Sequence, residues 1–182
     1  MSALATLSLN GGSGDDAITA APTIANRITG NAGADTIVLG SGIDMVITGS
    51  TIATNGADTI TGFTTTVDKF NVDALGTATA ITATGATAAY THAINSVPFF
   101  TGLAAGSADV SNAALITALN AAIVKTAAIA GVVSYIIVVD DNSSALYSVA
   151  DDGIANEYTG DTIVLMGTID AVLVSGDIIF TG

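Results

Sequence analysis

The stretch that decides the fold is Gly11-Gly12-Ser13-Gly14-Asp15-Asp16-Ala17-Ile18, in which closely spaced glycines precede an aspartate and, after one spacer, a large apolar residue. An acidic or amide residue two places before an apolar one occurs six times in the first 70 residues. The apolar members follow at steps of 10, 9, 9, 14 and 10 residues and are Ile18, Ile28, Ile37, Val46, Ile60 and Phe70. A step of about nine residues predicts the stacked coils of a parallel β-roll.

The copies differ in how closely they follow this pattern. Residues 30–37 form a second good copy, which runs directly into residues 40–46. Between the first two lies a decayed copy with Asn26 in the place of the aspartate. After Asp44 the register slips by about five residues around positions 51–55 and then resumes. A Gly/Asp-rich loop region or an ordinary set of hairpins is the alternative interpretation.

This segment resembles the RTX (repeats-in-toxin) nonapeptide family. The resemblance implies that each nonapeptide is half a coil, a glycine-rich turn followed by a short strand, and that every second turn stacks on the same side. It also implies that each aspartate shares a Ca²⁺ with a neighbouring turn, while backbone carbonyls supply further oxygens. The metal-binding residues that it implies here are Gly12, Gly14, Asp16, Asn26, Gly33, Asp35, Gly42, Asp44, Asp58 and Asp68.

Applied to this chain, the resemblance arranges the side chains in two columns. Column 1 is Asp16, Asp35 and Asp58, and column 2 is Asn26, Asp44 and Asp68. We expect calcium between successive members of column 1. Column 2 is expected to be weaker, because Asn26 carries no charge and the insertion at 51–55 disturbs the stacking. The apolar residues two places on are expected to form one inward ladder.

The charge of the chain is consistent with cation binding. Acidic residues number 16 against 3 basic ones, giving a formal net charge of −13, and every acid except Glu157 is an aspartate. Short aspartate carboxylates in turns are typical ligands of hard cations, and bound Ca²⁺ would relieve the mutual repulsion. An acidic solubilising surface is the alternative, although it does not explain the bias towards aspartate. Nucleic-acid binding is not expected, because it requires lysine and arginine.

Several classes of site and of location are disfavoured by the sequence. There is no cysteine, which excludes disulfides, and a single histidine, His92, which argues against a Cys/His metal site. The longest apolar stretch, roughly residues 127–139, is shorter than the ~20 residues that span a bilayer. The first residues lack the basic and apolar regions of a Sec signal peptide. We therefore expect a protein that does not span the membrane and that leaves the cell by another route.

The predicted fold class is mainly β, with two parts. Residues 1–76 are expected to form the calcium-binding roll, closed by residues 58–76 with Phe63 and Phe70 over its open end. Residues 77–182 are expected to form a β-rich assembly or secretion unit. Within it, apolar residues at helical spacing predict one helix near 111–125, and residues 132–150 read as a β-hairpin.

Two further acidic turns are candidates for calcium. Asp140 lies at EF-hand-like offsets from later polar residues, but the required glycine is Ala145 and strands flank the loop, so an EF-hand is not expected. Binding of Ca²⁺ by the turn at Asp140/Asp141 or by the turn at Asp151/Asp152 stays an open alternative. His92 is interpreted as a structural or surface residue.

The C-terminal tail and the lack of catalytic motifs suggest a class of function. Residues 158–182, with the preceding hairpin, resemble the C-terminal region of type I-secreted RTX proteins, including surface-layer proteins. No nucleophile elbow, metalloprotease motif or aromatic sugar cleft is present. We expect a non-enzymatic, secreted or cell-surface protein that folds on Ca²⁺ and self-assembles into a lattice or filament, with a cell-surface polysaccharide as a candidate partner. The alternative is the C-terminal export module of a larger adhesin or hydrolase.

Overall fold

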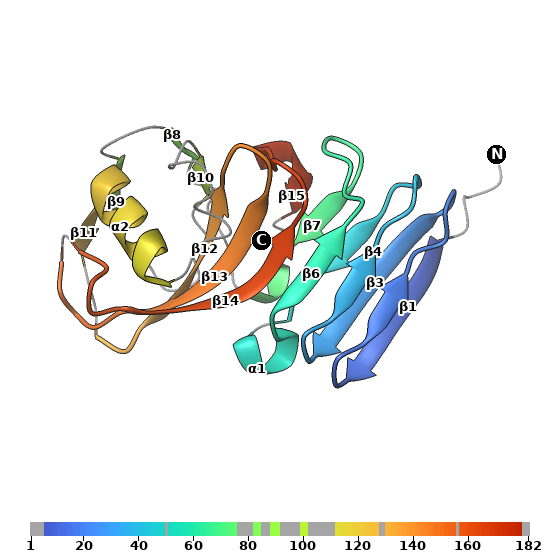
Figure 1. Ribbon diagram of the computed structural model, residues 1–182, viewed down its shortest axis with the longest axis horizontal. Helices are drawn as coiled ribbons and strands as arrows, with labels where there is room; N and C mark the ends of the chain where they lie inside the picture. The colour runs from blue at the N-terminus through green and yellow to red at the C-terminus, as the bar shows by residue number, and fades with distance from the viewer. Residues whose placement is uncertain are drawn as a thin grey trace.

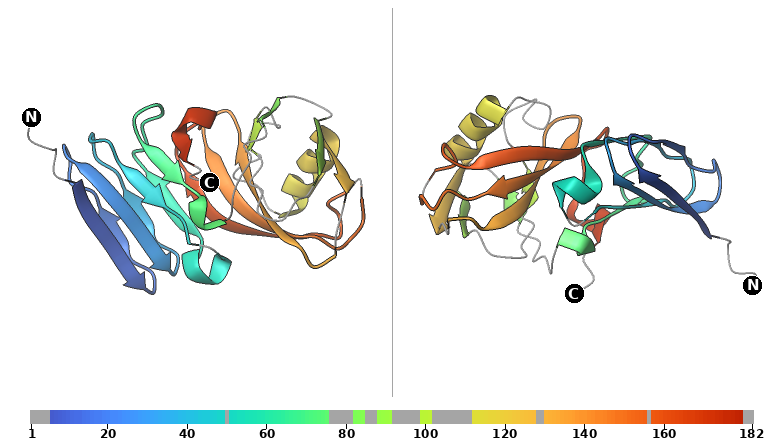
Figure 2. Two further views of the ribbon diagram at one scale, coloured as in Figure 1. Left: turned by 180° about the vertical axis from the view of Figure 1, so that it is seen from behind. Right: turned by 90° about the horizontal axis from the view of Figure 1, so that it is seen from below.

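The computed structural model describes residues 6–49, 51–75, 82–84, 88–91, 99–101, 112–127, 130–155 and 157–179. These residues are mainly in β-strands, and α2 (Asn112–Ala122) is the longer of two α-helices among them. The predicted fold class is confirmed. The roll lies at one end of the molecule and α2 at the other, as Figures 1 and 2 show.

Seven short strands build the roll; they alternate between two sheets, and within each sheet they pair in parallel with one another. They are β1 (Thr6–Ser13), β2 (Ala17–Thr19), β3 (Ala25–Ala32), β4 (Thr36–Val38), β5 (Met45–Ile47), β6 (Asp58–Thr61) and β7 (Lys69–Asn71). The odd-numbered strands pair in the order β1-β3-β5-β7, and the even-numbered ones in the order β2-β4-β6. Because consecutive strands belong to opposite sheets, the chain winds as a coil (Figure 1).

The apolar residues of the repeat form two inward ladders, one on each sheet, rather than the single ladder expected. Ile18 pairs with Ile37 and Ile37 with Ile60 on one sheet, while Ile28, Val46 and Phe70 pair on the other. All except the partly buried Ile18 are at most 3% exposed. Half-coils that alternate between sheets necessarily divide one sequence ladder into two facing rows.

The insertion at 51–55 contains a single helical turn, α1 (Ile52–Asn55). Its last residue, Asn55, is buried and accepts a hydrogen bond from the Gly49 N–H at 2.7 Å. The Asn55 amide also donates to the Met166 carbonyl at 2.8 Å. The extra residues are therefore held outside the coil, and Asp58 returns to the register of column 1.

Strands from the C-terminal half extend both sheets of the roll. β14 (Thr162–Ile169) pairs in parallel with β6, and β15 (Ile178–Ile179) pairs in parallel with β7. The predicted hairpin is confirmed as β12 (Val133–Val139) and β13 (Ser144–Ala150), an antiparallel pair. The other elements are η1 (Asp73–Leu75), β8 (Thr82–Thr84), β9 (Ala88–Thr91), β10 (Phe99–Thr101), β11 (Ile123–Ala127) and η2 (Ser175–Asp177).

The helix is shorter than the expected span of 111–125. α2 ends at Ala122, and Ile123 begins β11, which pairs with β9. Ile123, Val124 and Thr126 are β-branched, and such side chains favour a strand over a helix. Leu115 and Leu119 of α2 pack with residues of β12 and β13 in a buried cluster. The helix therefore covers one face of the C-terminal sheet.

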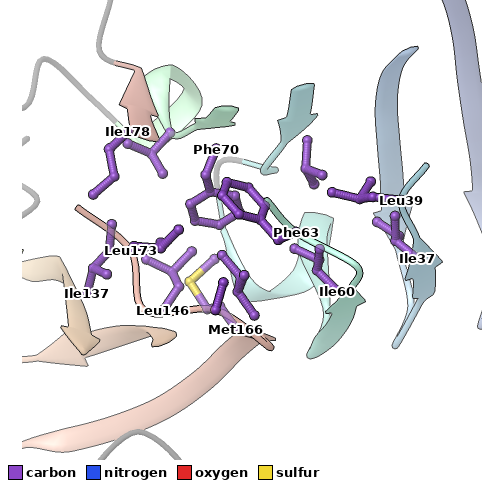
Figure 3. Close-up of a cluster of buried hydrophobic side chains, with 14 of the residues drawn as sticks. Ile37, Leu39, Ile60, Phe63, Phe70, Ile137, Leu146, Met166, Leu173 and Ile178 are labelled. Atoms are coloured by element: carbon purple, nitrogen blue, oxygen red, sulfur yellow. The ribbon is translucent and has the colours of Figure 1, made fainter. Parts of the chain in front are cut away.

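The main core joins the roll to the C-terminal half (Figure 3). Phe63 and Phe70 were expected to cover an open end of the roll, but they are buried beside Met166 and Leu173 instead. They lie inside because β14 and β15 continue the two sheets past them. The predicted boundary at residue 76 remains a prediction, and both sheets contain residues from either side of it.

The inward rows give a test of the roll. Ile37 is 0% exposed, whereas Val38 on the same strand is 39% exposed. We expect Ile37→Ala to lower the free energy of unfolding by about 2–5 kcal/mol, because it removes buried methyl groups and leaves a cavity. Val38→Ala, the matched control, should change it by no more than about 0.5 kcal/mol. Denaturant unfolding with calcium measures both, and equal losses would contradict the inward assignment.

Candidate metal centre

The turns before β2, β4 and β6 stack one directly on another. Gly33 has φ 131° and Gly56 has φ 68°, a region of backbone conformation that favours glycine. A Cβ on Gly33 would collide with the carbonyl oxygen of Gly14, and one on Gly56 would collide with that of Gly33. Glycine is therefore required by both conformation and close stacking, which brings carbonyl oxygens of successive coils together.

Column 1 is held together by hydrogen bonds from backbone to side chain between coils. The Asp16 N–H donates to Asp35 Oδ1 at 2.9 Å, and the Asp35 N–H donates to Asp58 Oδ1 at 3.1 Å. Each carboxylate therefore reaches back to the coil before it. The structure brings all three members of this column into one stack, with Gly12 and Gly14 in its first turn and Gly33 in its second.

Two carboxylate oxygens of column 1 are left without a hydrogen bond in the described part of the chain. They are Asp16 Oδ2 and Asp35 Oδ2, and both atoms are buried. A Cβ on Gly11 would be 2.8 Å from Asp16 Oδ2 and 2.7 Å from the Gly30 carbonyl oxygen, so both oxygens lie on the side of Gly11 where another residue would have its side chain. Asp35 Oδ2 likewise lies against Gly30. The glycines at positions 11 and 30 therefore let these carboxylate oxygens approach the backbone closely.

These oxygens fit a hard cation. A buried, unpaired carboxylate oxygen is costly, and Ca²⁺ takes carboxylate and backbone carbonyl oxygens. Column 1 offers both kinds, with Asp35 only 1% exposed. When bound, Ca²⁺ would supply the positive charge that these oxygens lack, and Asp16, Asp35, Asp58 and the neighbouring glycine carbonyls would hold it.

Asp58, at the inner end of column 1, has a perturbed acidity. Its pKa is raised to about 7, chiefly by burial; the hydrogen bond from the Asp35 N–H lowers it, the nearby Asp35 carboxylate raises it, and a hydrogen bond with Asn55 lowers it. Burial also raises the pKa of Asp68 in column 2. The raised pKa values of Asp58 and Asp68 indicate that the fold places these carboxylates where a negative charge is poorly solvated.

Column 2 repeats the hydrogen bonds between coils but leaves fewer oxygens available. The Asn26 N–H donates to Asp44 Oδ1 at 3.0 Å, and the Asp44 N–H donates to Asp68 Oδ1 at 2.8 Å. The second oxygens also have donors: Gly40 N–H for Asp44 at 3.0 Å and Thr64 N–H for Asp68 at 2.8 Å. The predicted ligand Gly42 lies in the turn of this column, against the Ile24 carbonyl.

Three residues of this arrangement were missed in the sequence. Leu7 pairs with Asn26, so it occupies the aspartate position of an earlier half-coil, where no side-chain oxygen marked it. Asp170 accepts from the Gly62 N–H at 2.9 Å, and Asp177 accepts from the Thr66 N–H at 2.6 Å. The two carboxylates close the last turn of column 2 from the far end of the chain. The sequence pattern that could have indicated Asp170 and Asp177 is an aspartate followed by two apolar residues.

The acidic turns of the C-terminal half are mainly engaged in local hydrogen bonds. Asp140 Oδ1 accepts from the Asn142 and Ser143 N–H groups of its own turn. Carboxylate oxygens of Asp151, Asp152 and Asp161 lie within 4.8 Å of one another and could hold a metal ion. Calcium at either turn stays a prediction. His92 lies outside the described residues.

The fold and the site define a class: a parallel β-roll with carboxylate-lined, glycine-rich turns. Residues 25–46 match the family model of the RTX calcium-binding nonapeptide repeat (4 copies), so the chain carries repeats of the RTX family, as its sequence indicates. Such repeats imply calcium binding and are typical of secreted proteins. A search of curated proteins found no match to this chain. None of the helices in the described ranges is long and apolar enough to cross a membrane.

Asp35 is the residue whose loss should matter most for calcium. We expect Asp35→Asn to lower calcium affinity by at least about tenfold, since even outer-shell changes at metal sites cost about 10- to 100-fold. Calcium titration by calorimetry measures this. Glu157→Gln, which removes the same charge at a position that is not a predicted calcium ligand, is the control. Equal affinities for the wild type and Asp35→Asn would contradict a metal site in column 1.

The raised pKa of Asp58 gives a pH dependence. Between about pH 4 and pH 7 the folded state keeps a proton that the unfolded state has lost, so without calcium the free energy of unfolding should fall as pH rises. Because protons and Ca²⁺ compete for the carboxylate, calcium affinity should rise over the upper part of that range. The folded fraction at pH 5 and pH 8, measured by circular dichroism in calcium-free buffer with a stabilising osmolyte, tests the first effect. Asp58→Asn should show a smaller difference between the two pH values, and an unchanged difference would count against this origin.

Proposed function

We propose that this protein is a non-enzymatic, secreted structural subunit that folds on extracellular Ca²⁺ and assembles into a surface layer, sheet or filament. The observation that carries the calcium part is the pair of buried carboxylate oxygens in column 1, Asp16 Oδ2 and Asp35 Oδ2, which have no donor in the described part of the chain. Metal binding would satisfy them. A cell-surface polysaccharide is a candidate partner, and neither nucleic acid nor a membrane-spanning role is proposed.

Calcium would make folding of the chain depend on whether it is inside or outside the cell. The chain carries a net charge of −13, and its column carboxylates lie close together only when the coils are stacked. Without metal, their repulsion and poor solvation oppose folding. Calcium modules outside cells bind at about 10⁻⁴–10⁻³ M, so the chain would stay unfolded where calcium is scarce. Outside the cell, metal binding would supply the folding free energy.

The open end of the roll supports assembly. β1 lies at one edge of the five-stranded sheet, and β2 lies at an edge of the eight-stranded sheet. The two edges are at the same end of the molecule (Figure 1). Leu7 on β1 is 40% exposed there. Unpaired backbone groups on an edge strand accept strands of another chain, so this end is the surface through which a second copy would add.

The same observation favours a second candidate function. The edges of β1 and β2 would equally accept preceding coils of a longer chain. In that case the residues would form the C-terminal calcium-binding and export module of a larger type I-secreted adhesin or hydrolase. The intact mass of the native secreted polypeptide separates the two candidates. A mass near 17.8 kDa supports the subunit, and a much larger mass supports the module.

Calcium-dependent folding and assembly can be measured together. Circular dichroism should show strand content that rises on addition of millimolar calcium and falls on chelation, because the metal supplies folding free energy. Electron microscopy of the same samples should show ordered sheets or filaments only when calcium is present. Full strand content in chelator would refute the folding half of the proposal. Folded protein without ordered assemblies would refute the assembly half.

A further inference from the structure

We propose that the side-chain amide of Asn26 takes the place of a bound cation in column 2, so that this level of the roll is complete without metal. The inference rests on the proposed calcium binding of column 1 and specifies which levels of the roll take the ion. It makes Asn26 the residue that determines how many calcium ions the chain binds.

Three oxygens converge on the Asn26 amide nitrogen. Nδ2 lies 2.6 Å from Asp44 Oδ1, 2.8 Å from the Ile24 carbonyl oxygen and 3.1 Å from the Ala21 carbonyl oxygen. Asn26 is 1% exposed and Asp44 is 0% exposed, so water does not provide the donors. One carboxylate and two carbonyl oxygens are the ligand types that Ca²⁺ takes. Here the neutral amide donates its two hydrogens to these oxygens instead of a cation.

The remaining polar atoms of this level also have partners. Asn26 Oδ1 accepts from the Ala21 N–H at 3.2 Å, and Asp44 Oδ2 accepts from the Gly40 N–H at 3.0 Å. No side-chain oxygen of Asn26 or Asp44 is left unsatisfied. In column 1 the corresponding level lies between Asp16 and Asp35, where both Oδ2 atoms lack a donor in the described residues. The two sides of the coil therefore differ in their need for metal.

Replacing the side-chain nitrogen of residue 26 with an oxygen should convert a level that is complete without metal into one that binds a cation. An aspartate there would replace the amide nitrogen with an oxygen that has no hydrogen to donate to the Asp44 carboxylate or to the Ile24 and Ala21 carbonyls. Such a group of buried oxygens is unfavourable without a cation. The same oxygens, together with the new carboxylate, form a donor set for Ca²⁺. The structure therefore assigns Asn26→Asp as a change that adds a metal site rather than one that merely disrupts the roll.

Asn26→Asp tests the inference by ion count and by stability. Calcium titration by calorimetry should show one more ion per chain than in the wild type. At a limiting calcium concentration that still folds the wild type, the melting temperature of the variant should fall below that of the wild type, and saturating calcium should restore it. Asn120→Asp is the matched control, because it adds the same charge on α2 and keeps the oxygen that accepts from the Tyr158 N–H. This control should bind the wild-type number of ions.

The outcomes separate this inference from the proposed function. A wild type that binds no calcium refutes calcium-dependent folding itself. If the wild type binds calcium but Asn26→Asp binds no additional ion, or stays unfolded with calcium, the inference is overturned. Asn26→Ala gives an independent check, since it should lose stability at both limiting and saturating calcium while keeping the ion count. Loss of one ion in Asn26→Ala would mean that Asn26 already ligates metal, which would also overturn the inference.

Discussion

The hydrogen bond from an aspartate N–H in one coil to the carboxylate of the next coil is the interaction on which the rest of the structure depends. It occurs from Asp16 to Asp35, from Asp35 to Asp58 and from Asp44 to Asp68, always in the turn before a strand. Because it fixes the turns in register, the residues two places later meet inside the roll. It also brings the backbones of successive turns so close that only glycine fits at Gly33 and Gly56.

This interaction also creates the electrostatic problem of the fold. Carboxylates that stack from coil to coil become buried beside like charges, which raises the pKa of Asp58 to about 7. The chain offers little positive charge of its own, with 3 basic residues. In column 2, backbone N–H groups and the Asn26 amide donate hydrogen bonds to the carboxylate oxygens. Column 1 leaves Asp16 and Asp35 with oxygens that suit a calcium ion.

The repeat spacing predicted the parts of the structure that neighbouring copies determine. It placed Asp16, Asp35 and Asp58 in one column and Ile28 and its partners inside, because stacking depends on residues about 19 apart. It could not find Asp170 and Asp177, whose partners are 108 and 111 residues away. Leu7 was missed because it has no oxygen. The strand at Ile123 replaced the end of the helix because pairing with β9 outweighed the helical spacing.

We propose that column 1 carries calcium and that the Asn26 level does not. A crystal structure grown with calcium and analysed by anomalous scattering tests this most directly. We expect metal peaks about 2.3–2.6 Å from carboxylate oxygens of Asp35, with none between Asn26 and Asp44. An anomalous map without a peak at Asp35, or with one at Asn26, would contradict it.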